Sequence, residues 1–203
     1  FSLALKPLHD YPSLDILFYR VFYATGLLVF LNFIFRNRLV RANIQVFREL
    51  SITDKTRFLT LTILGGFLLV FNWFLFMYAV NHVSLQSASF AYLICPIITT
   101  VLAFFILKER LGWWQWTAVG LCILSCGILS YGDLYGLVYS LVIAVSFALY
   151  LISQRKNDRF DKFIVLMVQM VIASLVLLPF FPTYSGPTPT ASLFYILMGV
   201  IVV

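Results

Sequence analysis

Charged side chains are scarce in this chain of 203 residues: Asp, Glu, Lys and Arg together make up 11% of it, whereas 62% of it is hydrophobic. Soluble globular domains carry about 25% charged residues. The mean hydropathy is +0.98, and a soluble fold of this size cannot bury so much apolar surface. The composition therefore excludes an ordinary soluble domain and indicates a chain that lies mostly in lipid.

Residues that commonly form catalytic or metal sites are also few. Cys95, Cys122 and Cys126 all fall in apolar runs, and two thiols four residues apart do not make a disulfide framework or a metal site. The two histidines, His9 and His82, lie far apart in the sequence. No G-x-S-x-G, H-E-x-x-H or paired-aspartate motif occurs. We therefore expect no catalytic residue, no metal and no cofactor, which argues against an enzyme.

Four stretches longer than 20 residues contain no charged residue at all: 58–107, 111–132, 134–154 and 163–203. A membrane-spanning helix needs about 20 apolar residues, so the first and last stretches can each hold two spans. Irregular backbone cannot face lipid, which makes the predicted fold an all-α polytopic bundle. We expect about seven complete spans plus a partial first or last span. The predicted segments are a stub at 1–7, spans near 13–35, 58–80, 86–107, 113–131, 134–153 and 163–181, and a last span that starts near Thr190 and ends with the chain at Val203.

The net charge is +6, but it does not indicate a nucleic-acid partner, because membrane proteins concentrate Lys and Arg in cytoplasmic loops. Here the basic residues gather in segments 36–57, 108–110 and 155–162, and the alternate connections between spans contain none. We therefore expect these three segments to be cytoplasmic. The first of them mixes Ile44 and Phe47 with polar residues, which fits either an interfacial amphipathic helix or a plain solvated loop.

Several motifs resemble the EamA-type transporters of the drug/metabolite transporter superfamily. The similar segments are Tyr19-Arg20-Val21-Phe22-Tyr23-Ala24, then Pro96 with the apolar run to Glu109-Arg110-Leu111, and Trp116-Thr117-Ala118-Val119-Gly120 continuing to Gly127. Asn72-Trp73-Phe74-Leu75-Phe76 with Ala79-Val80-Asn81-His82 resembles the RarD branch, the chloramphenicol-sensitive protein group. That branch usually has His-Arg where Tyr19-Arg20 stands here.

The resemblance implies ten helices in two inverted five-helix repeats, in a bacterial inner membrane. Residues 1–131 would then form the first repeat, with its first helix largely missing, and 132–203 the start of a truncated second repeat. Phe1 is not a natural start, so we expect a fragment. Arg20 and Ala24 in the span near 13–35 correspond to Gln169 and Ala173 in the span near 163–181, which is a short internal similarity (the internal echo).

Arg20 is the first candidate for substrate binding. It is placed about two turns into its predicted span, where an arginine must snorkel, pair with a group such as Asp15, or face a polar cavity. A guanidinium in such a cavity suits an oxyanion or a carbonyl group.

The other candidates for substrate binding are Asn72, Trp73, Gln86, Ser89, Tyr92, Pro96 and Gln169. Asn72 needs a partner within the membrane, and a helix–helix hydrogen bond serves as well as a substrate. Gln86, Ser89 and Tyr92 are spaced to form one polar stripe, which could line a pathway or make helix contacts. Pro96 removes a backbone hydrogen bond and predicts a bend.

Lys108, Glu109 and Arg110 are interpreted as turn residues. Glu109 lies beyond the apolar run, where a carboxylate favours the start of the following helix. We expect it to shape the turn and cap that helix instead of binding a substrate.

The sequence favours a secondary transporter (an exporter or permease) of a small organic metabolite or drug-like molecule, working by alternating access. A passive facilitator or channel is the alternative. No Asp or Glu lies in the interior of a predicted span, so any proton-coupling carboxylate would belong to absent spans. The expected partners are the substrate and the lipid bilayer, and the sequence leaves monomer and dimer both open.

Overall fold

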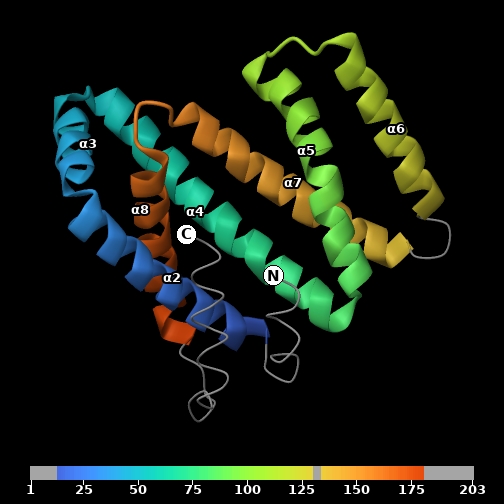
Figure 1. The fold of residues 1–203 in the computed structure, drawn as a ribbon, viewed down its shortest axis with the longest axis horizontal. Helices are drawn as coiled ribbons and strands as arrows, with labels where there is room; N and C mark the ends of the chain where they lie inside the picture. Colours follow the sequence, from blue (N-terminus) through green and yellow to red (C-terminus); the bar gives the residue numbers. More distant parts are fainter. Residues whose placement is uncertain (1–12, 130–133, 181–203) are drawn as a thin grey trace. The chain divides into compact units, whose positions relative to one another are not determined.

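The computed structural model describes residues 13–129 and 134–180, and all regular structure in these ranges is helical. Figure 1 shows the helices, which follow one another along the chain with short connections. They are α2 (Ser13–Phe35), α3 (Asn37–Glu49), α4 (Ile52–His82), α5 (Leu85–Leu107), α6 (Trp113–Leu129), α7 (Leu134–Lys156), α8 (Lys162–Leu177) and a 3-10 turn, η2 (Leu178–Phe180). The stub predicted at 1–7 and the last span predicted from Thr190 lie outside the described residues.

Four of the helices are long and apolar enough to cross a membrane: α2, α4, α5 and α7. The helix α8 is a shorter apolar helix of 16 residues. The prediction of an all-helical membrane protein is therefore confirmed. The segment for which the sequence left helix and loop open contains the helix α3, with Arg38, Arg41 and Arg48 exposed.

Side chains and backbone conformation fix where these helices begin and end. The Ser84 hydroxyl accepts a hydrogen bond from the backbone N–H of Ser87 (3.0 Å) and so caps α5. The α5 helix ends at Lys108, whose left-handed backbone (φ 56°) terminates it. The Asp161 carboxylate accepts from the N–H groups of Phe163 (3.0 Å) and Ile164 (3.3 Å), which caps α8.

The chain forms two compact units. Unit 1 contains the chain through Phe67 and again from Lys156, and unit 2 contains Leu68–Arg155. The continuous helix α4 contributes its first part to unit 1 and its second part to unit 2.

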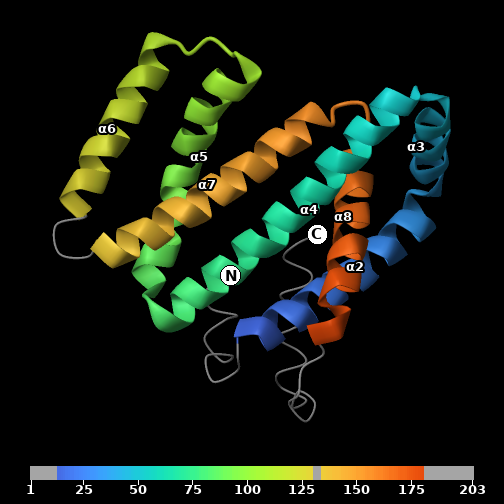
Figure 2. The same ribbon diagram turned by 180° about the vertical axis from the view of Figure 1, so that it is seen from behind.

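In unit 1, α2 packs against α8 (Figures 1 and 2). The two helices run in opposite directions, because Arg36, just after α2, pairs with Asp161, just before α8 (2.9 Å). Their buried faces are largely aliphatic. The face of α2 includes Ile16, Leu17, Val21, Ala24 and Leu28, and that of α8 includes Val165, Met170, Ala173 and Leu177.

In unit 2, small side chains let α4, α5 and α7 pack closely. Ala79, Ala88 and Ala91 are completely buried in a cluster with Phe76 and Ile143. The Ser140 hydroxyl of α7 donates to the Ser87 carbonyl of α5 (2.6 Å). A second cluster, formed by Ile94, Cys95 and Ala144, is bordered by Cys122 and Cys126 of α6, so the three cysteines fill space in packed regions.

Candidate functional site

Arg20 lies on the buried face of α2, and only 6% of its surface is exposed. A snorkelling arginine keeps its charged head in water. The burial of Arg20 in unit 1 therefore argues against snorkelling. An arginine enclosed within a membrane protein is costly to retain and is typically functional. Arg20 therefore remains the leading candidate for contact with a substrate.

Gln169 occupies the buried face of α8, where it is 1% exposed. The helix α4 comes close to it at Gly66: a β-carbon built on Gly66 would lie 3.4 Å from the Gln169 carbonyl oxygen. A small residue at Gly66 thus lets α4 lie close to α8 beside a buried amide. Arg20 and Gln169 both belong to unit 1.

Thr25 and Ser174 join α2 to α8 through their hydroxyl groups, 2.7 Å apart. Thr25 also lies 2.7 Å from the Val21 carbonyl oxygen, and Ser174 lies 2.9 Å from that of Met170, so each contacts the residue four positions earlier on its own helix. This pair of hydroxyl groups was not predicted from the sequence. The signal was present, since Thr25 and Ser174 directly follow Ala24 and Ala173 in the internal echo.

Asn72 of α4 is fully buried in unit 2 and contacts α7. Its amide nitrogen donates to the Ile143 carbonyl (2.7 Å) and to the Ser146 hydroxyl (3.0 Å). Its side-chain oxygen has no hydrogen-bond partner among the described residues. The nitrogen therefore makes a helix–helix hydrogen bond, one of the two alternatives expected for Asn72. The neighbouring Trp73 is 6% exposed.

Gln86, Ser89, Tyr92 and Pro96 share the exposed face of α5, opposite its buried alanines. The stripe that the spacing predicted is therefore formed, but it lies on the surface of unit 2 and outside its core. The Tyr92 ring is 37% exposed and packs on Phe76, with ring centres 5.1 Å apart. Whether this face touches substrate remains a prediction.

The charged turn after α5 is solvent-exposed. Both carboxylate oxygens of Glu109 accept from the Arg155 guanidinium at the end of α7 (3.0 and 3.2 Å). About half of each side chain is exposed, so the pair contributes little to stability. The first turn of α6 is instead satisfied by Gln115, whose side-chain oxygen accepts from the Gly112 N–H (2.8 Å). Lys108 has the left-handed backbone conformation that ends α5, and the Arg110 side chain is exposed.

The eight candidate residues are thus divided between the units. Arg20 and Gln169 belong to unit 1, and the other six belong to unit 2. Among the described residues, no group of three or more His, Cys, Asp or Glu side chains is placed to hold a metal ion.

A polar and aromatic network in unit 1 was not foreseen from the sequence. It links α3 and the start of α4 to the segment between α7 and α8. The Asp161 N–H donates to the Asn43 side-chain oxygen (3.0 Å), and Arg159 pairs with Asp54 (3.5 Å). The Phe58 ring packs on Phe160, with ring centres 4.0 Å apart. These contacts join residues more than one hundred positions apart, which no local pattern reveals.

Together, the long apolar helices of the described residues define an all-helical polytopic membrane protein. The EamA-like transporter family model matches residues 1–131, well over half of the chain, so this chain belongs to the EamA-like transporter family. The match shows the family and does not specify a substrate.

Curated relatives agree with this assignment. The chain is 31% identical to the uncharacterized transporter YojE of Bacillus subtilis (strain 168) over 160 residues, which cover 78% of this chain and 51% of YojE. It is 37% identical to Protein RarD of Streptomyces exfoliatus (49% of this chain, 32% of the relative). It is 39% identical to Protein RarD of Escherichia coli (strain K12), over 42% of this chain and 29% of the relative. The matched segments thus span 29% to 51% of these relatives' length. No solved structure matches it.

Proposed function

We propose that the full protein is a secondary transporter that moves a small organic molecule by alternating access between two inverted repeats. The observation that carries this proposal is the Thr25–Ser174 hydrogen bond. In repeats related by a two-fold axis in the membrane plane, equivalent helices run in opposite directions and meet at equivalent residues near the axis. Thr25 and Ser174 are 149 positions apart, the same offset as Arg20 and Gln169.

The burial pattern of the two helices supports the same register. With that offset, buried positions of α2 coincide with buried positions of α8: Ile16 with Val165, Phe18 with Met167, Arg20 with Gln169, Val21 with Met170, Ala24 with Ala173 and Leu28 with Leu177. Residues 1–131 then represent the first repeat and 132–203 the beginning of the second.

The register puts Arg20 and Gln169 on opposite sides of the Thr25–Ser174 contact. Each precedes its hydroxyl residue by five positions, about 7.5 Å along a helix, and the helices are antiparallel. A substrate that moves past the contact would meet a guanidinium in one half of the membrane and an amide in the other. A guanidinium favours oxyanions, so we infer a substrate with an anionic or carbonyl group.

The loop charges support an orientation in a bacterial inner membrane. Segments 36–57, 108–110 and 155–162 carry most of the Lys and Arg, and such loops face the cytoplasm in membrane proteins. We infer that Gln169 lies in the cytoplasmic half of the membrane and Arg20 in the external half. Single cysteines introduced at Arg38 and at His82 would react with an impermeant thiol reagent from opposite sides.

The test is uptake by proteoliposomes that contain the full-length protein. The probes are an equimolar mixture of small aromatic and aliphatic carboxylates and their uncharged amides, quantified by mass spectrometry. We expect the wild type to take up particular carboxylates faster than protein-free vesicles do, and to accelerate their exchange when unlabelled compound is preloaded. Arg20→Ala would lower this flux at least tenfold without loss of membrane insertion.

Arg38→Ala is the matched control, because it removes an arginine from an exposed position on α3. Its flux should equal that of the wild type. Unchanged flux in Arg20→Ala would contradict the role of Arg20. Flux that preloaded substrate does not accelerate would indicate a channel or passive facilitator instead of an alternating-access carrier.

A further inference from the structure

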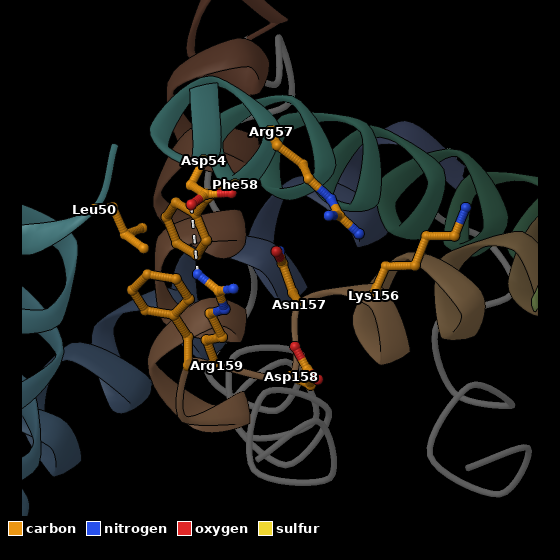
Figure 3. A pocket seen from close by; sticks show the side chains of 9 residues that line it. Leu50, Asp54, Arg57, Phe58, Lys156, Asn157, Asp158 and Arg159 are labelled. Atoms are coloured by element: carbon orange, nitrogen blue, oxygen red, sulfur yellow. Dashed lines mark ion pairs between the residues drawn. The ribbon is translucent and has the colours of Figure 1, made fainter. Parts of the chain in front are cut away.

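A pocket of about 230 Å³ lies in unit 1, where the first turns of α4 approach the segment after α7 (Figure 3). Its walls consist mainly of charged and aromatic side chains. The lining residues are Leu50, Asp54, Arg57, Phe58, Lys156, Asn157, Asp158, Arg159 and Phe160. None of the substrate candidates lines this pocket, so it is a separate feature of the molecule.

The charges in the pocket do not cancel. Arg159 is paired with Asp54 (3.5 Å), whose carboxylate also accepts from the Ser51 hydroxyl (3.1 Å). Arg57 and Lys156 make no ion pair with any described residue. Asp158 is the remaining carboxylate, and Figure 3 shows Asn157 between it and Arg57. Arg57 and Lys156 are therefore two cations that can bind an anion, and Asp158 is the one exposed carboxylate of the pocket that would repel it.

Asn157 lines the pocket and is held in place by hydrogen bonds. It is 5% exposed, its amide nitrogen donates to the Thr62 hydroxyl (3.2 Å), and its backbone carbonyl accepts from the Lys162 ammonium group (3.0 Å). Lys156 directly precedes this anchored residue. The Lys156 backbone is thus held in place opposite the first turns of α4. Little ordering of the chain is therefore needed for the Lys156 side chain to reach a ligand.

A second, shallower hollow shares Arg57 and Lys156 with the pocket. Its other lining residues are hydroxyl-bearing or aliphatic: Ile52, Thr53, Thr56, Thr60 and Leu61. Thr53, Thr56 and Thr60 recur every three or four residues and so lie along one side of α4. The Arg57–Lys156 pair thus has a charged pocket on one side and a mixed hydroxyl and hydrocarbon surface on the other.

The position of the pair relative to the bilayer identifies the ligand chemistry. Arg57 is the last charged residue before the charge-free run 58–107, which places it at the level of lipid headgroups. Leu59, Ile63, Leu64 and Phe67 continue along α4 with exposed side chains. A ligand there needs an anionic head of a size that two cations can hold and a hydrocarbon part that follows the helix.

We propose that Arg57 and Lys156 form a binding site for the phosphate group of an anionic phospholipid. The Arg57 guanidinium provides two parallel donors that match a phosphate, and Lys156 adds a point charge. The Thr53 and Thr60 hydroxyls provide further donors beside the pair, and the aliphatic side of α4 accommodates the acyl chains. Basic pockets between membrane helices are suited to such headgroups.

The experiment measures lipid binding by the full-length protein in detergent micelles. A fluorescent phosphatidylglycerol is the probe, and the matching phosphatidylcholine is the zwitterionic comparison. We expect tighter binding of phosphatidylglycerol, and a loss of about 20-fold in affinity in the double variant R57Q/K156Q. D158N should bind two- to fivefold more tightly, because it removes the unpaired carboxylate.

The matched control is R38Q/R41Q, which removes two exposed arginines from α3 and so makes the same change in net charge. Its affinity should stay within twofold of the wild type, and an equal loss in both double variants would overturn the proposal. R57K keeps the charge but loses the paired donors, so it should lose a few-fold even if R57Q/K156Q does not fold.

Inorganic phosphate is the competing ligand. Displacement of phosphatidylglycerol by micromolar phosphate would show that the site takes a soluble anion, and would overturn the lipid assignment. Displacement only at tens of millimolar, with the same weakening from sodium chloride of equal ionic strength, would support it. Equal binding of phosphatidylcholine and phosphatidylglycerol would also contradict it.

Discussion

Thr25 and Ser174 form a hydrogen bond of 2.7 Å between antiparallel helices, and both hydroxyls also contact the carbonyl four residues earlier on their own helix. Such symmetrical bonding is expected where two equivalent helices meet at a two-fold axis. Thr25 additionally lies 3.1 Å from the Met170 carbonyl oxygen, a contact without a symmetrical counterpart among the described hydrogen bonds. Two different sequences therefore produce a nearly symmetrical junction.

The first prediction concerns the energy of this junction. Thr25→Ala and Ser174→Ala should each destabilise the protein by about 0.6 kcal/mol, with an upper limit of about 1.7 kcal/mol, as found for hydrogen bonds between membrane helices. The double variant should cost less than the sum, because the two groups share one bond. Thermal unfolding in detergent gives these values. Thr117→Ala is the control, since among the described residues Thr117 bonds only within its own helix (2.8 Å to the Trp114 carbonyl oxygen).

The second prediction concerns the close approach of α4 to α8 at Gly66. A β-carbon there would lie 3.4 Å from the Gln169 carbonyl oxygen, an ordinary contact. Gly66→Ala should therefore change stability little, whereas Gly66→Leu should cost about 1–3 kcal/mol by overpacking. Gly26→Leu is the matched control, because no atom of the described residues, apart from the neighbouring backbone of its own helix, lies within 4 Å of a β-carbon built there. Equal melting temperatures for the two leucine variants would refute the close approach.

Most helices could be predicted because their apolar runs end at charges or turns. The starts predicted at 13, 86, 113, 134 and 163 lie within one residue of α2, α5, α6, α7 and α8. The start of α4 was predicted six residues late, since the helix begins at Ile52 in a charged stretch. The missed signal is the Ser51 hydroxyl, which accepts from the Asp54 N–H (3.2 Å) and caps the helix.

The candidate site was less predictable from the sequence. Helical spacing could indicate that Gln86, Ser89 and Tyr92 share a face of α5, but it could not show that this face is exposed. The partners of Asn72 are on α7, 71 and 74 positions away. Such contacts depend on how whole helices pack, so they cannot be derived from local patterns.

The third prediction separates two roles of Asp161. Its carboxylate caps α8 and pairs with Arg36, whose guanidinium also lies over the Phe163 ring. Asp161→Asn keeps a capping oxygen and should cost only the ion pair, about 0.2–1 kcal/mol. Asp161→Ala should cost about 1 kcal/mol more. The difference in unfolding free energy between the two variants isolates the cap. The neighbouring exposed Asp158→Ala should have little effect.

The fourth prediction concerns Asn72. Its amide nitrogen bonds two acceptors on α7, so Asn72→Ala should destabilise unit 2 by about 1–2 kcal/mol. We expect the transport rate per folded molecule to stay near that of the wild type. The measurement combines thermal unfolding with proteoliposome flux, normalised to the fraction of folded protein. Loss of flux without loss of stability would instead place Asn72 in contact with substrate.

The Arg36–Asp161, Asn43–Asp161 and Asp54–Arg159 contacts also limit how the chain between these residues can cross a bilayer. Water-exposed segments that touch must be on the same side of a membrane. The chain between Asp54 and Arg159 must therefore cross an even number of times. It contains three long apolar helices, α4, α5 and α7, and the remaining helix there is α6, 17 residues long. If α4, α5 and α7 each cross once, parity requires α6 to cross as well among the described helices, although its length of about 26 Å is slightly less than the hydrocarbon thickness of a typical bilayer.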